Sequence, residues 1–183
     1  DGFERGEGIG ALIIQVHSSL KPIKTDHVWA KLMGSSCIHK GGGASLRALR
    51  GPAIEYKVKN ALRDANIMPN DIAYIEASGL GEPLGDAIEA GAYQNVFFAQ
   101  QLHRSLALCF GSVHTNVGHL DGASGMVSLL KSALGERNMM IAPLVHFTRL
   151  SSLMNGSCGA ALAIEMGHTW RDVEIYKLSC FPM

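Results

Sequence analysis

Residues 111–125 (GSVHTNVGHLDGASG) join the end of an apolar stretch to a glycine-rich segment, with His119 at the junction. The apolar residues that precede them are typical of a buried strand, and those after His119 recur at helical spacing. Glycines at such a turn let backbones approach closely and leave amide groups free for a ligand. In α/β sheets, ligands bind where strands end and helices begin. The segment therefore predicts an α/β fold with a site at His119. This histidine either donates a hydrogen bond to a substrate carbonyl oxygen, or has a structural role in which it caps the turn or satisfies a buried carbonyl.

A second junction of the same kind lies at residues 77–79 (ASG). Hydrophobic periodicity around the two junctions predicts alternating strands and helices, which is the pattern of a layered α/β domain. The expected strands or extended stretches are residues 11–16 (a buried strand), 28–38, 72–75, 106–110, 159–164 and 173–176. The expected helices are one that opens at Gly51-Pro52 and ends before residues 68–71, one from about 84 to 99, and one from 120 to about 134. The apolar face of the last helix is expected at Ala123, Met126, Val127, Leu130 and Leu134.

Composition fits one compact domain. Hydrophobic residues make up 47% and charged residues 17% of the 183, and 16 basic and 16 acidic side chains give a formal net charge of zero. This composition predicts a packed core rather than disorder. The balanced charge gives no support to nucleic-acid or anionic-membrane binding. No apolar run approaches the ~18 residues that span a bilayer, so no transmembrane segment is expected.

Four cysteines stand far apart, with no CxxC pair: Cys37, Cys109, Cys158 and Cys180. Cys37 and Cys109 lie in apolar segments, where we expect buried, reduced thiols and hence a reducing compartment.

The spacing of His114 and His119 across a strand-to-helix turn does not match a metal-ligand pattern, so no metal is expected.

Three segments, collinear along the chain, resemble motifs of the β-ketoacyl synthases, the condensing enzymes of fatty-acid and polyketide synthesis. Residues 1–10 (DGFERGEGIG) resemble the family's DGFxRGEGxG segment. Residues 75–89 (IEASGLGEPLGDAIE) resemble its EAHGTGTPLGDPIEA segment, and residues 111–125 resemble its GSVKSNIGHLEGAAG segment. The resemblance implies a thiolase-like α/β fold. Residues 1–183 are then expected to form a single ketosynthase-like domain, the C-terminal half of that fold and part of a larger domain.

The resemblance also implies catalytic roles. The family uses a nucleophilic cysteine, which holds the acyl chain as a thioester, and two histidines that assist malonyl decarboxylation and stabilise the oxyanion. The first histidine falls on Ser78, and the second falls on His119 and is retained. The family's lysine falls on His114, and two threonines that resemble pantetheine-binding positions fall on Leu80 and Glu82. The cysteine belongs to a segment upstream of the DGF motif, outside these residues.

These substitutions predict a site that does not condense acyl groups as it stands. A missing acid–base group costs about 10²–10⁴-fold in rate, and a missing oxyanion donor about 10²–10³-fold. Ser78 donates only a neutral hydrogen bond, and without the cysteine the acyl chain has no point of attachment. Two interpretations remain open. The domain either passes on an acyl chain without elongating it, or is a catalytically dead scaffold or subunit of a larger assembly, which the number of substitutions favours.

Other motif residues are expected to preserve the fold. Arg5 and Glu7 are expected to form a buried ion pair, and Gly118 to fix a turn. Asp86 is expected to complement the dipole of its helix and to cap backbone amides. For Asn116, a structural role in the turn and a catalytic role are equally supported.

The resemblance further implies partners. No tightly bound cofactor is expected, while the phosphopantetheine of an acyl carrier protein could contact the glycine-rich helix starts. Apolar surface is expected where an N-terminal ketosynthase half or a homodimer mate would pack, so the isolated chain is expected to be poorly soluble or oligomeric. Residues 151–161 (SSLMNGSCGAA) stand where the family has a segment similar to SSFGFSGTNAH.

Overall fold

The computed structural model describes residues 2–16, 28–39, 41–43, 45, 48–98, 108–148 and 150–154, together with the backbone of residues 162–163 and 178–180. Strands β1 (Tyr74–Glu76), β2 (Leu108–Gly111), β3 (Leu162–Ala163) and β4 (Leu178–Cys180) form one sheet in the order β3-β2-β1-β4. Every pairing between them is parallel, and Ile75 of β1 pairs with Phe110 of β2 and with Ser179 of β4.

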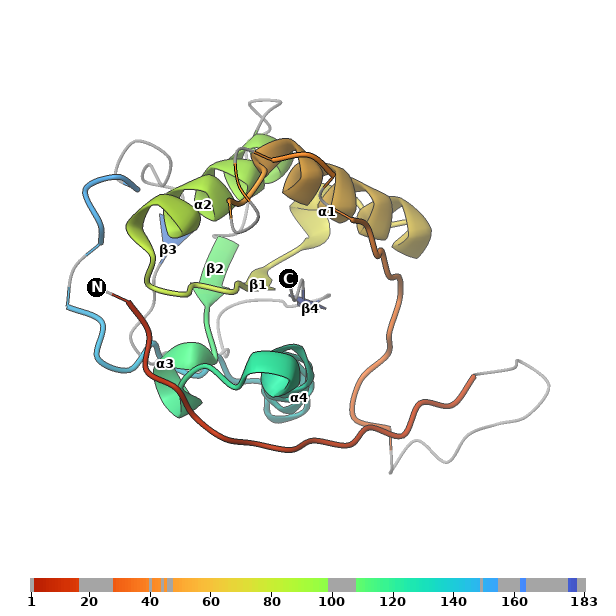
Figure 1. The fold of residues 1–183 in the computed structure, drawn as a ribbon. Helices are drawn as coiled ribbons and strands as arrows, with labels where there is room; N and C mark the ends of the chain where they lie inside the picture. The colour runs from red at the N-terminus through yellow and green to blue at the C-terminus, as the bar shows by residue number, and fades with distance from the viewer. Residues whose placement is uncertain are drawn as a thin grey trace.

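Helices cover both faces of this sheet (Figure 1). Helices α1 (Gly51–Ala65) and α2 (Pro83–Phe97) lie together on one face, and α3 (His114–Val117) and α4 (Ser124–Asn138) lie on the other. Both α1 and α2 carry a proline in the first turn, where its missing N–H leaves no helical bond unmade. Short 3₁₀ helices at Pro69–Asp71 and Asp121–Ala123 precede β1 and α4. The predicted α/β class is confirmed.

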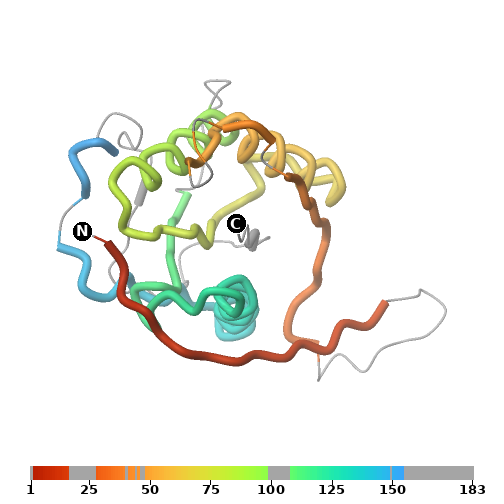
Figure 2. The backbone as a smooth tube through the Cα atoms, viewed as in Figure 1, coloured from red at the N-terminus to blue at the C-terminus, as the bar shows by residue number. Residues whose placement is uncertain are grey.

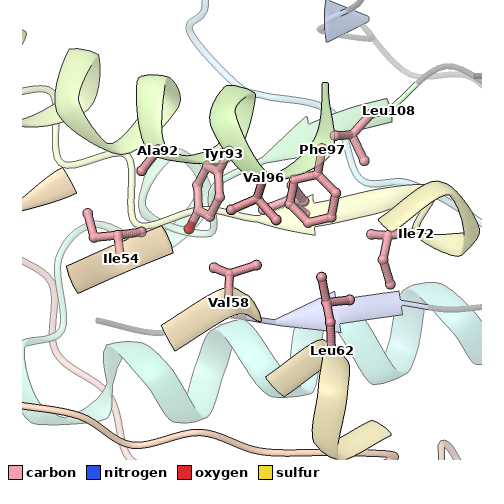
Figure 3. Close-up of a cluster of buried hydrophobic side chains, with 10 residues drawn as sticks. Ile54, Val58, Leu62, Ile72, Ala92, Tyr93, Val96, Phe97 and Leu108 are labelled. Carbon is pink, nitrogen blue, oxygen red and sulfur yellow. The ribbon is translucent and has the colours of Figure 1, made fainter. Parts of the chain in front are cut away.

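The main core lies between α1, α2 and the sheet (Figure 3). Side chains at helical spacing on α1 and α2 interlock over β1 and β2, and full burial of a Val, Leu, Ile or Phe side chain is worth about 1.5–3 kcal/mol. The buried members are Ile54, Val58, Leu62, Ile72, Ile75, Ala92, Tyr93, Val96, Phe97 and Leu108. Leu84, an apolar residue at the start of α2, lies outside this core and is exposed.

Helix α4 presents a different face to the sheet from the predicted one. Ser128 and Ser132 are its buried residues, while Leu134 is exposed. The apolar residues instead meet the N-terminal segment, because a Cβ on Gly10 would lie 2.5 Å from Cγ of Met126. The hydrophobic pattern correctly predicted an apolar stripe, but it did not specify whether the sheet or another segment covers that stripe.

The expectation of a buried strand near the N-terminus is wrong. Residues 11–16 form no strand, and the Ile13 side chain is fully exposed, because these residues are not paired with the described sheet. Residues 28–38, expected as an extended stretch, belong to no strand and run beside the end of α1, where the Ser35 N–H donates to Asp64 Oδ2 at 2.8 Å. This exposed course leaves Cys37 exposed as well, whereas Cys109 is buried in β2 as expected.

The predicted C-terminal strands are only partly covered by the described residues. Strand β3 lies inside the predicted stretch 159–164, whereas residues 173–176 and the end of the predicted helix at Ala99 lie outside the described residues. Strand β4 follows the predicted 173–176 stretch and borders β1.

Candidate active site

The first residues of the chain, red in Figure 2, run past the loops that follow β1 and β2. The Gly2 N–H donates to the Gly81 carbonyl at 2.9 Å, in the loop after β1. The His119 N–H donates to the Glu4 carbonyl at 2.8 Å, and the Gly6 N–H donates to the His119 carbonyl at 3.0 Å. Three backbone hydrogen bonds therefore hold the N-terminal segment to both loops.

Two of these contacts require glycine. A Cβ on Gly6 would lie 2.2 Å from the Val117 carbonyl oxygen, and one on Gly81 would lie 2.4 Å from the Gly2 carbonyl oxygen. Gly81 also has φ +76°, a conformation that side chains disfavour. The close approach of backbones in this region therefore depends on these residues.

The loop after β1 is held by a buried carboxylate. Glu89, only 3% exposed on the inner side of α2, accepts the N–H of Ser78 at 2.9 Å and that of Gly79 at 3.1 Å. The Tyr93 hydroxyl donates to the same carboxylate at 3.0 Å. Charge-assisted bonds to backbone amides are stronger than neutral ones, so Glu89 defines the position of Ser78.

Asp86 holds the same loop one turn nearer the start of α2. Its Oδ2 accepts the Gly81 N–H at 3.0 Å. Burial, and then the negative charge of Glu89, raise the pKa of the Asp86 carboxyl from 3.8 to about 6, although backbone hydrogen bonds from Gly81 and Leu80 oppose the shift. Asp86 therefore joins the loop to the helix while its own charge is disfavoured by its surroundings.

The loop after β2 contacts the backbone carbonyl of Ser78, in the loop after β1. Ser112 Oγ donates to the Ser78 carbonyl oxygen at 2.8 Å, and His114 Nδ1 lies 2.6 Å from that oxygen. The Nε2 atom of His114 is buried and has no hydrogen-bond partner among the described residues. A ring nitrogen without a partner therefore lies at the meeting point of the two loops.

His119 lies beside His114. The two rings stack with centroids 4.8 Å apart and an interplanar angle of 29°. The Phe3 ring packs on His119 as well, with centroids 4.8 Å apart and an interplanar angle of 41°. His119 Nδ1 accepts the Asp121 N–H at 3.2 Å, and the Asp121 Oδ1 lies 3.3 Å from the same nitrogen. The His119 side chain is 19% exposed, so it is oriented by contacts but remains accessible.

The structure thus brings together Ser78, in the loop after β1, with His114 and His119, which both follow β2. Their joint geometry provides two imidazoles beside one fixed backbone carbonyl, which is suited to binding a carbonyl group and moving a proton. Among the residues that the structure describes, no group of three or more histidines, cysteines and carboxylates forms a metal site.

The other predicted site residues lie at the margin of this centre. Leu80 is half-buried and Glu82 is exposed just before α2. Asn116 is exposed, and its Nδ2 donates to the Pro143 carbonyl at 3.4 Å. Gly118 has φ +76° in the turn that leads to the second histidine.

The expected pairing of Arg5 with Glu7 is corrected by the structure. Arg5 Nη1 instead lies 3.8 Å from Asp121 Oδ2, and both side chains are largely exposed. The cause is the bridge between Arg5 and His119, which carries the arginine to the turn that contains Asp121.

Three residues of the site were missed by reasoning from the sequence. Glu89 is an acidic residue flanked on both sides by apolar and small residues of a helix, which is a signal for a buried acceptor. Ser112 and Phe3 carried no comparable signal, because their roles depend on loops that meet only in the fold.

Comparison with known proteins agrees with this architecture. A family model described as the C-terminal domain of beta-ketoacyl synthase matches residues 29–148. The chain therefore belongs to the β-ketoacyl synthase family and carries its C-terminal domain, with the thiolase-like fold.

The relatives include large synthases. The chain is 33% identical over 92% of its length to the PKS-NRPS hybrid synthetase ATPKS of Aspergillus niger, and 32% identical over 93% to erythronolide synthase EryA3 of Saccharopolyspora erythraea. It spans only 9% and 5% of those two proteins. The chain is thus a ketosynthase-like domain related to those of polyketide synthases.

Solved structures show the same fold. The oxazolomycin ketosynthase domain OzmH KS7 of Streptomyces albus JA3453 matches 78% of this chain with a TM-score of 0.71 and 26% identity, over 24% of its own length. The ketosynthase from module 1 of the bacillaene synthase of Bacillus amyloliquefaciens FZB42 matches 70% of this chain with a TM-score of 0.66 and 30% identity, over 23% of its own length. Among the described residues, no helix has the length and apolar character to cross a membrane.

Proposed function

We propose that this domain accepts acyl thioesters and transfers the acyl group without condensing it with a malonyl unit. The observation that carries the proposal is the identity of residue 78. By resemblance to the family, Ser78 stands at the place of the first catalytic histidine. Its hydroxyl cannot hold the positive charge of an imidazolium, so the loss of decarboxylation is expected to be about 10²–10⁴-fold.

The remaining frame supports binding of a carbonyl group. Glu89 holds the Ser78 backbone through two amide bonds, and Ser112 and His114 both contact the Ser78 carbonyl. His119 keeps a partly accessible ring beside them. A retained donor at an oxyanion position is worth about 10²–10³-fold in rate, which supports an acyl-transfer role over complete inactivity.

A catalytically dead scaffold is the second candidate. It is favoured by Leu80 and Glu82, which replace the two threonines at the family's pantetheine-binding positions. Leu80 offers no side-chain hydrogen bond, and the exposed Glu82 carries a negative charge at the end of the loop after β1, just before α2. Both changes would weaken contact with a pantetheine arm.

The proposed acyl donor is the phosphopantetheine thioester of an acyl carrier protein. The cysteine that would receive the chain is proposed to belong to the N-terminal ketosynthase half, which would pack against this domain. Exposed apolar side chains along residues 9–16 support such a contact, or one with a homodimer mate; they include Ile9, Ile13, Ile14 and Val16.

The test uses the native polypeptide that carries this chain. It is incubated with acyl and malonyl thioesters of N-acetylcysteamine, and intact mass, carbon dioxide release and ketide product are measured. We expect an acyl adduct with neither decarboxylation nor ketide product. Formation of a ketide product would contradict the proposal, while the absence of any adduct would favour the scaffold.

A further inference from the structure

We propose that His114 is a catalytic residue of acyl exchange, with its Nε2 atom accepting the proton of the attacking thiol. This inference rests on the proposed acyl-transfer function. It assigns a role to the position where the family has a lysine, a residue that has no ring nitrogen.

The hydrogen bond from the first loop defines the tautomer of His114. The Ser78 carbonyl oxygen can only accept, so the ring nitrogen 2.6 Å away, Nδ1, must donate and carries a proton. In the neutral imidazole the lone pair is then on Nε2. Glu89 accepts the Ser78 N–H and so holds the Ser78 backbone in place, which in turn fixes the carbonyl that orients the His114 ring.

The Nε2 atom is the ring nitrogen of His114 that no described residue satisfies. It is buried and has no hydrogen-bond partner among the residues that the structure describes. Because an unpaired buried acceptor is unfavourable, a ligand that brings a hydrogen-bond donor satisfies the atom. A pantetheine arm carries a thiol, two amides and a hydroxyl as donor groups, and of these only the thiol has the proton that acyl exchange must remove.

His119 has the complementary role. Its Nδ1 accepts the Asp121 backbone N–H at 3.2 Å, so the proton of the neutral ring is on Nε2. If the ring becomes charged, Asp121 Oδ1 at 3.3 Å accepts from Nδ1, and Nε2 still donates. The two rings stack with centroids 4.8 Å apart, so an imidazole with a free acceptor nitrogen lies beside an imidazole that can donate a hydrogen bond.

This pair matches thiol–thioester exchange. The attacking sulfur forms a bond to the acyl carbon while its proton moves to His114 Nε2. His119 Nε2–H donates to the carbonyl oxygen as negative charge develops there. When the tetrahedral intermediate collapses, the original carbon–sulfur bond breaks, and the proton on His114 passes to the departing thiolate.

The test measures transfer of an acyl group from its N-acetylcysteamine thioester to the native polypeptide, and its release to free N-acetylcysteamine. In H114N the amide can still donate to the Ser78 carbonyl, but the Nε2 position is lost. H114A removes both and leaves room for imidazole added to the solution. H39N, at an exposed histidine, is the matched control.

We expect H114N and H114A to lose about 10²-fold in exchange rate, as for a missing general acid–base group, and H39N to be unchanged. Added imidazole should restore activity to H114A but not to H114N. An H114N rate equal to that of the unmodified protein, or a deficit in H114A that imidazole does not restore, would overturn the role of His114. The proposed acyl-transfer function would still stand. Absence of exchange by the unmodified protein would overturn the proposed function, and the role of His114 with it.

Discussion

Lys131 of α4 and Glu76 of β1 form an ion pair beneath the sheet, with Nζ 3.1 Å from Oε2. The glutamate side chain is 0% exposed and the lysine side chain 12% exposed, and the Tyr74 hydroxyl also donates to the carboxylate. The pair therefore ties α4 to the strand that leads to Ser78. It also explains why the serine face of α4, rather than its apolar stripe, meets the sheet.

Replacing Lys131 by Met is expected to lower the free energy of unfolding by about 3–5 kcal/mol, because it leaves a buried carboxylate without its partner. Urea unfolding measures the change. Lys59→Met is the matched control, since Lys59 pairs with Glu55 on the surface of α1, where the loss should be at most about 1 kcal/mol. Equal effects of the two substitutions would contradict the buried pair.

Replacing Gly6 by Ala is expected to separate the N-terminal segment from the site. The new Cβ would lie 2.2 Å from the Val117 carbonyl oxygen, and such overpacking costs about 1–3 kcal/mol. Hydrogen exchange should show faster exchange at the His119 amide, which donates to Glu4. Gly42→Ala, where a Cβ meets nothing within 4 Å, should leave that amide protected.

Asp86 is expected to give the domain a specific pH dependence. Its folded pKa of about 6 lies above the ordinary 3.8, so between these values the folded state binds more protons than the unfolded state. The contribution of this group to stability is therefore greatest below pH 4 and falls as the pH rises to 6.

In Asp86→Asn, stability measured by urea unfolding across pH 4–6 should lack this decline, while the amide oxygen can still accept from Gly81. Asp71→Asn, on an exposed turn, is the control. An unchanged pH profile in the Asp86 variant would show that the carboxyl group is not responsible.

Replacing Ser78 by His is expected to restore the first imidazole of the family. Decarboxylation of a malonyl thioester by the native polypeptide should rise by about 10²-fold or more, as carbon dioxide release would show. Ser35→His, at an exposed serine, should have no effect. No gain from the Ser78 variant would show that residue 78 is not what limits this step.

The isolated chain is expected to self-associate through its exposed apolar side chains. Ile13 is fully exposed, so Ile13→Lys should reduce association in sedimentation without lowering the free energy of unfolding. Met68→Lys, at an exposed residue outside residues 9–16, should leave association unchanged. A monomer of the unmodified chain at micromolar concentration would contradict this expectation.

Much of the fold could be predicted from local patterns. Of the two proline-initiated helices, α1 has a strong 3.6-residue hydrophobic period and α2 a weak one, and the buried faces of both form the core seen in the structure. Because parallel strands end at one edge of a sheet, the loops after the neighbouring strands β1 and β2 meet there, which brings Ser78 to His114.

Other features depend on partners that are distant in sequence. The apolar run at residues 11–16 predicted burial, but no strand of the described sheet pairs with it. Met126 and Leu130 of the apolar stripe on α4 meet Gly10 of the N-terminal segment, and Leu120, before the helix, meets Gly8. Periodicity alone reveals neither contact.

The sequence by itself determined the α/β alternation, the two glycine-rich junctions and the residues that stand at them. Only the tertiary structure decided how these residues act together. The hydrogen bond of His114 reaches back 36 residues to the Ser78 carbonyl, and this partner determines which ring nitrogen is the acceptor. The proton-transfer role of an imidazole depends on the atoms around its two nitrogens, and here the fold brings those atoms from separate loops.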